Sequence, residues 1–447
     1  MDKNKDRPRG ERQRGQDGRR QGQRPGQRPG RREAGPADAR AGALALLAAV
    51  RGGATLGEGA ALLDGLPPGE RARAQRLAAA TLRARGRAEA VLAPLLCRTP
   101  APEIGDALAL AITEMLGLGE APHGAVNAAV EQVRALGPKG AAAAGMVNAV
   151  LRRAAEAQAD WDAAPATRLP AWLRSPVRAR WGEAVAAAIE AAHEALPPLD
   201  LTGKPGAALP GAALPTGSHR LEPGAQVSAL PGYAAGDWWV QDAAAALPAR
   251  MLDPQPGERI ADLCAAPGGK TMQLAAAGAE VTAVDLSEAR LARVDENLAR
   301  TGLNAKLVAA DALAWRPEAP LDAVLLDAPC SATGTIRRHP ELPLIRDGAM
   351  IPELVRLQAA LIDHALGLIR PGGRLVYAVC SVHPAEGEAQ LAAALARHPG
   401  LVVEPPAVPG VEAEWITPDG ALRTLPHHWS ARGGLDGFFA VRLRLPG

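Results

Sequence analysis

Two cysteines are the most reactive side chains of this sequence, and each directly follows a predicted strand. Cys330 lies in Asp327-Ala-Pro-Cys-Ser-Ala-Thr-Gly334, and Cys380 lies in Tyr377-Ala-Val-Cys-Ser381. Taken singly, each cysteine is better explained as a small buried apolar residue. Together, at the ends of what should be neighbouring parallel strands, they face one crevice, and a thiolate is a strong nucleophile. The pair therefore predicts covalent catalysis.

A glycine-rich turn precedes both cysteines. The stretch Arg259-Ile-Ala-Asp-Leu-Cys-Ala-Ala-Pro-Gly-Gly-Lys-Thr271 predicts a buried strand, a tight turn at 267–269 and a helix from Thr271. Such a unit presents backbone N–H groups and the positive end of a helix to a ligand. A phosphate-binding P-loop needs glycine where Cys264 stands, and the dinucleotide fingerprint G-x-G-x-x-G is absent. Nucleoside triphosphates and NAD are therefore disfavoured.

Acidic residues end the next three predicted strands. Strands near 280–285, 305–310 and 321–326 end at Asp285, Asp311 and Asp327. The carboxyl ends of parallel strands line the ligand crevice of an open α/β sheet, and an acid about 20 residues after the glycine turn can hold a ribose diol. One such acid alone is more simply a helix cap or a turn residue. Three of them in register indicate an adenosyl group without a pyrophosphate.

A methyl-donor site beside an acid and two thiols suits methylation of a pyrimidine. Carbon 5 of the ring is too weak a nucleophile to attack a sulfonium methyl unless a thiolate first adds to carbon 6. A carboxylic acid at ring nitrogen N3 favours this addition, a role that Asp327 fills if burial keeps it protonated. The carbon-5 proton and the first thiol must then leave, and the second cysteine could help. Spacing does not say which cysteine is which, and either Lys270 or Arg337 could lower the pKa of the nucleophile.

The chain divides into four predicted parts that must position these residues. Residues 1–36 contain almost no apolar side chains and cannot bury enough surface to fold. Residues 1–34 carry 10 Arg and 2 Lys against 3 Asp and 2 Glu, a net charge of +7, whereas the whole chain is +2. This tail is equally well explained as a salt-sensitive RNA tether and as a solubilising extension.

The other three parts are predicted to be folded. Residues 37–156 show helical periodicity throughout, for example over 38–50 and 56–63, with Cys97 as a core residue at a helix end. Residues 157–240 hold five of the eight Trp residues and predict a small connecting subdomain. In residues 241–447 strands and helices alternate as a doubly wound parallel sheet requires, and strands at 414–417 and 438–445 are expected to close one edge as an antiparallel hairpin.

Composition narrows the setting. Aromatic residues make up only 3% of the chain, so stacking on aromatic platforms is not expected to dominate base binding. No run of 18 apolar residues appears and the N-terminus is polar, which indicates a cytoplasmic protein without a membrane partner. The four cysteines have no C-x-x-C spacing, so we expect reduced thiols and no metal site. We also expect a monomer.

Three motifs of the chain closely resemble those of one enzyme family. They are Asp262-Leu-Cys-Ala-Ala-Pro-Gly-Gly-Lys-Thr271 and the two cysteine segments, and they are similar to motifs of the RsmB/NOP (Sun, Fmu) RNA (cytosine-5) methyltransferases. Residues 120–153, with Ala121-Pro-His-Gly-Ala-Val-Asn127, resemble the NusB-like N-terminal domain of that family. The resemblance implies a class I, Rossmann-like S-adenosylmethionine methyltransferase domain with a mostly parallel sheet, preceded by an all-α NusB-like domain that binds RNA.

The resemblance also implies roles for individual residues. It assigns the nucleophile to Cys380 and product release to Cys330, with Lys270 and Asp327 in the catalytic group. The S-adenosylmethionine contacts fall on Cys264, Ala265, Ala266, Pro267, Gly268, Gly269, Lys270, Asp285, Arg290, Asp311 and Asp327. Two positions depart from the family pattern. Val379 replaces a usual Thr, which should affect fit rather than chemistry, and Gly387 replaces a common Asn, which removes one possible hydrogen bond.

The implied reaction is methylation of carbon 5 of a cytosine in ribosomal RNA of the bacterial 16S type. The base must leave its stack, so a single-stranded, looped or partly melted region is the expected partner. Methylation of tRNA or DNA stays open, although a DNA enzyme would carry a Glu-Asn-Val segment that is missing here. A non-catalytic RNA-binding assembly factor also stays open, against which the intact residues Cys330, Cys380, Asp327 and Asp285 argue.

Overall fold

The computed structural model describes residues 36–222 and 224–447. The predicted unfolded tail therefore lies, except for Pro36, outside the described residues. Pro36–Gly447 form one structural unit. Within the described ranges, no helix combines the length and the hydropathy needed to cross a bilayer.

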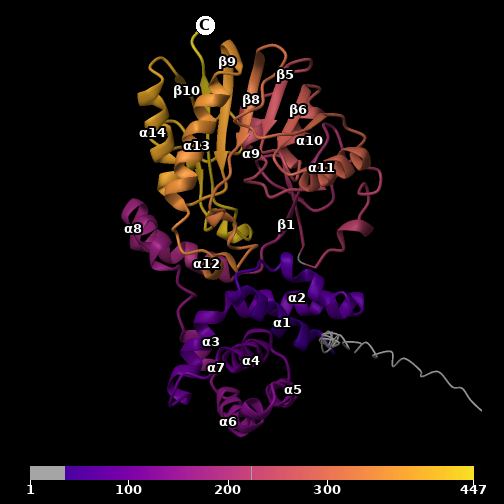
Figure 1. Cartoon of the computed structure of the whole chain (residues 1–447), viewed down its shortest axis with the longest axis vertical. Coiled ribbons are helices and arrows are strands. Elements are labelled where there is room, and N and C mark those ends of the chain that lie inside the picture. Colours follow the sequence, from indigo (N-terminus) through magenta and orange to yellow (C-terminus); the bar gives the residue numbers. More distant parts are fainter. Residues whose placement is uncertain (1–35, 223) are drawn as a thin grey trace, which may run out of the picture. The chain divides into compact units, whose positions relative to one another are not determined.

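The first part is helical, as predicted (Figure 1). It contains α1 (Ala39–Arg51), α2 (Pro68–Arg83), α3 (Arg85–Leu92), α4 (Pro102–Ile112), α5 (Pro122–Ala135) and α6 (Pro138–Ala154). The Asp38 side chain accepts a hydrogen bond from the Ala41 N–H and caps α1, and four of these helices begin with proline, whose fixed φ suits a first turn. Their apolar faces meet in two buried clusters, which contain Leu46 and Leu108.

Two details of this part differ from the sequence prediction. Residues 58–63 form a short 3-10 helix rather than an α-helix. Cys97 is exposed, so the prediction of a core residue was wrong. The helical backbone ends at Leu95, and Leu92 is the last buried residue before that end. Cys97 lies beyond it, in the loop that leads to α4.

The connecting part combines helices with a small sheet. It contains α7 (Gln158–Ala163), α8 (Ala171–Glu194), β1 (Leu199–Gly203), β2 (Ala212–Ala213), β3 (His219–Leu221) and β4 (Trp238–Val240). The four strands pair antiparallel in the order β2-β3-β1-β4. Trp238 and Trp239 are buried, as expected for tryptophans that hold a subdomain together. The sequence reading did not foresee α8, which contains Pro176 and a break at Gly182.

The last part is an eight-stranded, mostly parallel sheet, as predicted. Its strands are β5 (Arg259–Leu263), β6 (Glu280–Asp285), β7 (Lys306–Ala309), β8 (Leu321–Asp327), β9 (Ile369–Val379), β10 (Val402–Glu404), β11 (Leu422–Thr424) and β12 (Phe438–Arg444). The path is β10-β12-β9-β8-β5-β6-β7, with β11 also paired to β12. Strands β5 to β9 run parallel, so their carboxyl ends share one edge of the sheet.

The antiparallel side of the sheet is only partly as predicted. β12 pairs antiparallel with β9, as expected for residues 438–445. Residues 414–417 do not form its partner strand, because a 3-10 turn at Ala413–Trp415 directs the Trp415 side chain into the core, where it is 1% exposed. The partners of β12 are instead β10 and β11.

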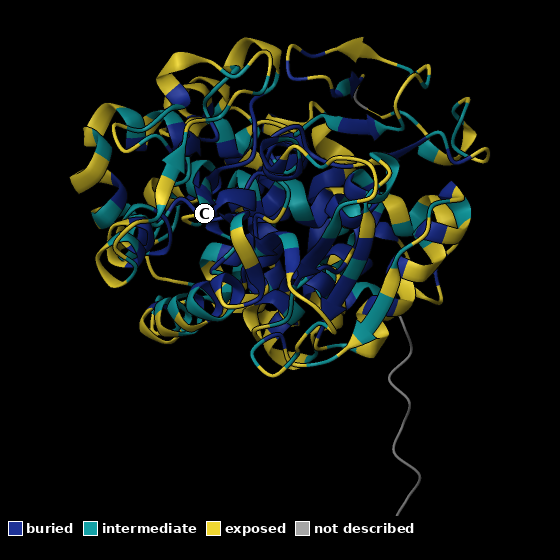
Figure 2. Ribbon diagram, turned by 90° about the horizontal axis from the view of Figure 1, so that it is seen from above, coloured by how far each residue is buried: buried dark blue, intermediate teal, exposed yellow. Residues whose placement is uncertain are grey.

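Helices cover both faces of this sheet. One apolar cluster joins the sheet to α13 (Ile351–Leu366) and α14 (Glu388–Arg397), and another joins it to α9 (Leu247–Leu252) and α10 (Gly269–Ala276). α11 (Glu288–Thr301) packs on α10 through Met272 and Val294. Buried ribbon is concentrated at the sheet, and the outer turns of the helices are exposed (Figure 2). The parallel strand ends are thus held between two packed layers.

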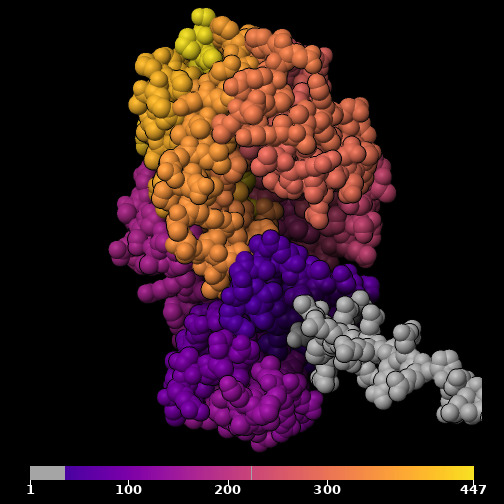
Figure 3. Space-filling model, in the orientation of Figure 1, coloured from indigo at the N-terminus to yellow at the C-terminus, as the bar shows by residue number. Residues whose placement is uncertain are grey.

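The N-terminal helices contact the segment that follows Cys330 (Figure 3). The Arg83 guanidinium donates to the Arg337 carbonyl at 2.9 Å, and the Leu56 N–H donates to the Glu341 carboxylate at 3.3 Å. Ile345, on α12 (Leu342–Ile345), packs against the cluster formed by α1 and α2. The helical domain therefore supports one of the two cysteine-bearing loops.

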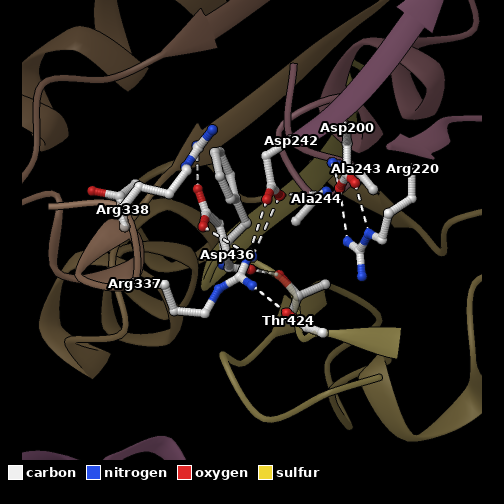
Figure 4. A network of polar contacts seen from close by, with 12 residues as sticks. Asp200, Arg220, Asp242, Ala243, Ala244, Arg337, Arg338, Thr424 and Asp436 are labelled. Carbon is white, nitrogen blue, oxygen red and sulfur yellow. Dashed lines mark hydrogen bonds and ion pairs between the residues drawn. The ribbon is translucent and has the colours of Figure 1, made fainter. Parts of the chain in front are cut away.

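A buried ionic network joins three distant segments of the chain (Figure 4). The Arg337 guanidinium, 1% exposed, donates to Asp242 at 3.1 Å and to Asp436 at 3.2 Å, and Arg338 also pairs with Asp436. Burial and the nearby Asp242 carboxylate raise the pKa of Asp436 to about 6, although both arginines oppose the rise. The Thr424 hydroxyl donates to the Asp436 carbonyl at 2.8 Å. The network fixes the segment after Cys330 to the start of β12 and to the chain before α9.

Replacing Arg337 by leucine should strongly destabilise the protein. The change leaves two buried carboxylates with less compensation, and removing one partner of a buried ion pair costs about 3–5 kcal/mol. The midpoint of denaturant unfolding measures the loss. The matched control is Arg370→Leu, whose pair with Asp322 is half exposed and should be worth only about 0–1 kcal/mol. Equal losses in the two variants would contradict the structural role of Arg337.

Candidate active site

The two predicted cysteines meet at the carboxyl edge of the sheet. β8 and β9 are parallel neighbours, and the loops that follow them place Cys330 Sγ 3.4 Å from Cys380 Sγ. The backbone of these loops also pairs, because the Gly334 N–H donates to the Cys380 carbonyl at 3.0 Å. The two sulfurs therefore lie together at one edge of the sheet, as expected from the order of the strands. Val379 is fully buried in the core below them, as expected for a residue that affects fit.

The buried Glu386 carboxylate joins the two cysteine loops. Glu386 is 0% exposed and accepts hydrogen bonds from the Ser331 N–H at 2.9 Å, from the Ser381 hydroxyl at 2.6 Å and from the Gln358 amide at 3.0 Å. The Ser331 hydroxyl donates to it as well. Ser331 and Ser381 each follow a cysteine in the chain. Because both loops bind the same carboxylate, the separation of the two sulfurs is fixed by this contact.

Lys270 and Asp327 form an ion pair at the same edge. The Lys270 Nζ lies 2.7 Å from the Asp327 Oδ2 and 5.3 Å from the centroid of the Phe438 ring. Burial acts to lower the pKa of Lys270, but the negative charge of Asp327 outweighs it, and the pKa is raised. The ammonium is therefore present at neutral pH. The Asp327 side chain, its partner in the pair, is 30% exposed.

Of the two cations that the sequence offered as activators of a thiol, Lys270 is paired with Asp327. Arg337, considered from the sequence as an activator of the thiol, is instead held by Asp242 and Asp436. The adjacent Arg338 is paired with Asp436 as well.

The glycine-rich turn lies beside the end of β6. Gly268 has φ +96° and would bring a Cβ atom within 2.8 Å of Val294, so only glycine allows this approach of α10 to α11. The Asp285 carboxylate accepts hydrogen bonds from the Ala266 N–H at 3.1 Å and from the Ser287 N–H at 3.0 Å. Arg290 lies 3.4 Å from Asp285 and donates to the Ala266 carbonyl. The turn and the β6 acid are thus fixed to each other.

Two other predicted site residues show no catalytic feature. Burial, with the charges of Asp327 and Asp285, raises the pKa of Cys264 to about 12, so this thiol stays protonated at neutral pH. Asp311 is exposed and accepts a hydrogen bond from the Leu313 N–H at 2.9 Å, which is the role of a turn residue. The structure places both at the carboxyl edge of the sheet, and their predicted contacts to S-adenosylmethionine stay a prediction.

The residues at this edge fit an adenosyl sulfonium ligand. Asp285 offers a carboxylate for a ribose diol, and the adjacent Leu286, 77% exposed, offers an apolar surface for adenine. Asp262, at the base of the glycine turn, is fully buried, and its Oδ1 has no hydrogen-bond partner among the described residues. This chemistry matches the predicted S-adenosylmethionine site at Ala265, Ala266, Pro267, Gly268 and Gly269. Within the described ranges no cluster of His, Cys, Asp or Glu has a metal-binding arrangement.

Several residues of this site were missed by sequence reasoning. Glu386 was noted only within the segment Glu386-Gly-Glu388, and nothing in the sequence indicates that its carboxylate reaches two serines about 5 and 55 residues away. Gln358 is one polar residue of an amphipathic helix. Gly387, the departure from the family pattern, has a local cause, because a Cβ there would lie 2.3 Å from the Arg423 guanidinium.

Comparison with protein families gives two matches. Residues 249–444 match the model of the 16S rRNA methyltransferase RsmB/F family, and residues 38–156 match the NusB family. The second range agrees closely with the predicted helical domain.

Curated relatives carry the name ribosomal RNA small subunit methyltransferase B. The Pseudomonas putida protein is 36% identical over 437 residues, which covers 90% of this chain and 97% of that protein. The Klebsiella pneumoniae protein is 37% identical, with 79% and 90% covered. The Salmonella arizonae protein is 46% identical over 230 residues, and this match spans about half of each chain, 50% and 51%.

Solved structures support the fold. The structure of PH0851 has a TM-score of 0.65 at 22% identity and covers 90% of this chain and 98% of that chain. A methyltransferase homologue from Pyrococcus horikoshii has a TM-score of 0.51 at 27% identity and covers 61% and 93%. The predicted fold class, a methyltransferase α/β domain after a NusB-like helical domain, is thereby confirmed.

Replacing Glu386 by alanine should destabilise the two cysteine loops. Several donors, including those of Ser331, Ser381 and Gln358, lose their acceptor in a site without access to water, at a cost of about 3–5 kcal/mol in total. Thermal unfolding measures the loss against Glu318→Ala, in which an exposed glutamate is removed. An unfolding temperature equal to that of the control would show that Glu386 does not join the loops.

Proposed function

The chain belongs to the RsmB/F family of 16S rRNA methyltransferases, and from this premise we propose that it methylates carbon 5 of a cytosine in 16S ribosomal RNA through a covalent adduct with Cys380. One observation carries the proposal. Two sulfurs lie 3.4 Å apart, at the sheet edge that also holds the Lys270–Asp327 pair and the glycine turn. A methyltransferase acting on a nitrogen or oxygen atom needs no such pair of thiols.

S-adenosylmethionine, the methyl donor of this family, supplies an electrophilic methyl group when it is bound. Asp285 would hold the ribose of the donor, and Leu286 would contact the adenine. The backbone of residues 264–269 would line the remaining part of the donor site. Arg290 would keep the turn and Asp285 in register through its contacts to both.

The motif around Cys380 supports it as the nucleophile, because the family resemblance assigns that role to the cysteine of Tyr377–Ser381. The hydrogen bond to Cys380, followed by burial, raises the pKa of Cys330 well above its usual value, so Cys330 stays a thiol. The Cys380 sulfur would add to carbon 6 of the ring, which makes carbon 5 electron-rich.

The Lys270–Asp327 pair would support this addition. Carbon 6 becomes a better acceptor when ring nitrogen N3 is protonated or hydrogen-bonded. Asp327 would face N3, and its carboxylate would accept a hydrogen bond from N3 once that nitrogen takes a proton from water. The Lys270 ammonium, 2.7 Å from the carboxylate, would hold it in that position.

Release of the product requires two events. The bond between Cys380 and carbon 6 would break as the thiol proton of Cys330 passes to the Cys380 sulfur, and the proton on carbon 5 would pass to the Cys330 sulfur, so that the ring double bond forms again. Cys330 is the group placed to assist, because its sulfur is in contact with that of Cys380 and its loop shares the Glu386 carboxylate. The shared support keeps the second thiol beside the adduct until the bond breaks.

The two cysteine variants should fail at different steps. Cys380→Ala should lose methyl transfer to 16S ribosomal RNA by at least about 10⁴-fold, because no adduct forms. Cys330→Ala should accumulate a protein–RNA adduct that survives denaturing electrophoresis. Cys97→Ala, which removes an exposed thiol, is the control and should behave as wild type. An adduct in Cys380→Ala rather than in Cys330→Ala would reverse the two roles.

The target nucleotide can be identified by mapping 5-methylcytosine in ribosomal RNA. A strain that lacks the gene should lose one or a few methylated cytosines of 16S ribosomal RNA, and the wild-type gene should restore them, whereas the Cys380→Ala gene should not. Restoration by Cys380→Ala would overturn the covalent mechanism. Loss of a methyl group only from tRNA or DNA would overturn the substrate.

A further inference from the structure

A second cavity lies next to the cysteine loops and has no role in the mechanism above. It has a volume of about 710 Å³ and lies between α8 and the segment 412–431. We call it the flanking pocket and define it by Trp181, Glu414, Trp415, His427, His428 and Trp429. Three of the eight tryptophans of a chain with 3% aromatic residues are gathered here. Although the chain contains few aromatic residues, several of them are concentrated at this cavity.

The aromatic rings of the flanking pocket support one another. Trp415 and His428 stack with centroids 5.5 Å apart and planes inclined by 4°, and Trp429 meets Trp415 edge-on at 4.9 Å. Trp415 is 1% exposed, whereas Trp181, His427 and Trp429 are half-buried at the cavity surface. Trp429 has φ +53°, an uncommon conformation for a large residue. The result is a rigid surface of flat rings, which suits a flat ligand.

Polar groups of the flanking pocket indicate what the ligand can be. Trp415 Nε1 and His427 Nδ1 are buried and, in the described part of the chain, have no hydrogen-bond partner. Burial lowers the pKa of His427, and burial with the charge of His427 lowers that of His428 to about 3, so both rings are neutral. Two glutamates, Glu412 and Glu414, also line the cavity. Arg180 and Arg423 also line the cavity, and Arg423 is paired with Glu388. Glutamates and neutral imidazoles can hydrogen-bond to a nucleobase, and aromatic rings can stack on it.

The flanking pocket is connected directly to the nucleophile loop. Arg423, which lines the cavity, donates to the carbonyl of Ser381, the residue after Cys380. Arg423 also lies over the Trp181 ring, 5.5 Å from its centroid, and Leu425 packs beside Val382. The Arg423 side chain and the Ser381 backbone thus separate the cavity from the loop that carries the sulfur. A base in the cavity cannot be the one that reacts, but it can be its neighbour in the strand.

Resting on the proposed function, we propose that the flanking pocket binds an unpaired nucleobase adjacent to the target cytosine in the RNA strand. The base stacks on the aromatic surface and meets the hydrogen-bonding groups of Glu414 and His427. Its binding holds the strand in register, so that the target cytosine falls at Cys380. The pocket contributes to the choice of site rather than to bond making.

The test uses the full-length protein and a 16S ribosomal RNA fragment that contains the mapped cytosine. Abasic residues replace the nucleotides on either side of the target one at a time, and fluorescence anisotropy gives the affinity of each RNA. For wild type, one abasic position should weaken binding about tenfold, as loss of one stacked base does. His427→Ala and Glu414→Gln should each weaken binding of the intact RNA by a similar factor. Neither variant should further weaken binding of the RNA that carries the sensitive abasic residue. This coupling is the expected result.

Matched controls separate the pocket from general effects on the surface. His398→Ala removes a half-buried histidine that pairs with Asp363, and Glu318→Gln neutralises an exposed glutamate that pairs with Lys306. Both should leave RNA affinity unchanged. The proposal would be overturned if the loss of affinity caused by the variant and the loss caused by the abasic residue multiplied when the two were combined. It would also be overturned if no abasic residue beside the target weakened binding. The fluorescence of 2-aminopurine at the sensitive position should be quenched by wild type and less so by His427→Ala.

Failure of this proposal and failure of the proposed function give different results. If the flanking pocket is wrong, wild type still methylates the fragment, and the coupling between variant and abasic position is absent. If the function is wrong, wild type incorporates no methyl group into carbon 5 of cytosine, whatever the binding data show. The pocket variants should raise KM for the RNA about tenfold and leave kcat and S-adenosylmethionine binding unchanged.

Discussion

The Glu386 carboxylate is the constraint on which the catalytic geometry depends. It is fully buried, and it binds the residues that follow both cysteines, although these cysteines are 50 residues apart in the chain. A buried carboxylate is costly unless donors surround it, so the loops must stay closed around Glu386 to satisfy it. Because donors from both loops must surround the Glu386 carboxylate, the distance between the two sulfurs is well defined. The proposed covalent mechanism requires a well-defined distance, since both thiols would act on one ring in turn.

A second buried network extends this constraint to the rest of the molecule. Arg337 and Asp436 connect the segment after Cys330 with the start of β12, and Arg83 in the helical domain binds the Arg337 carbonyl. The NusB-like domain is therefore in contact with the catalytic loops through the same short segment.

The sequence was informative about features that depend on short, local patterns of residues. The alternation of strands and helices predicted the parallel sheet, and the motifs at Asp262–Thr271, Asp327–Gly334 and Tyr377–Ser381 predicted which edge would hold the site. It failed where contacts are made over long distances. The helix α8 and the 3-10 turn before Trp415 depend on burial against partners far along the chain, and Arg337 could not be told from Arg338 because only the fold decides which guanidinium meets Asp242. Cys97 was wrongly predicted to be buried, because the residues at a helix end do not show whether the chain that follows enters the core.

Gly334 and Gly437 touch through their main chains. A Cβ atom on Gly334 would lie 1.8 Å from the Gly437 carbonyl oxygen, and one on Gly437 would lie 2.4 Å from the Val382 side chain. A side chain at Gly334 would push the backbone before β12 away from the Cys330 loop, and one at Gly437 would displace Val382 in the loop after Cys380. Any library built to redirect this enzyme toward a new nucleotide should therefore hold both glycines constant and draw its diversity from elsewhere.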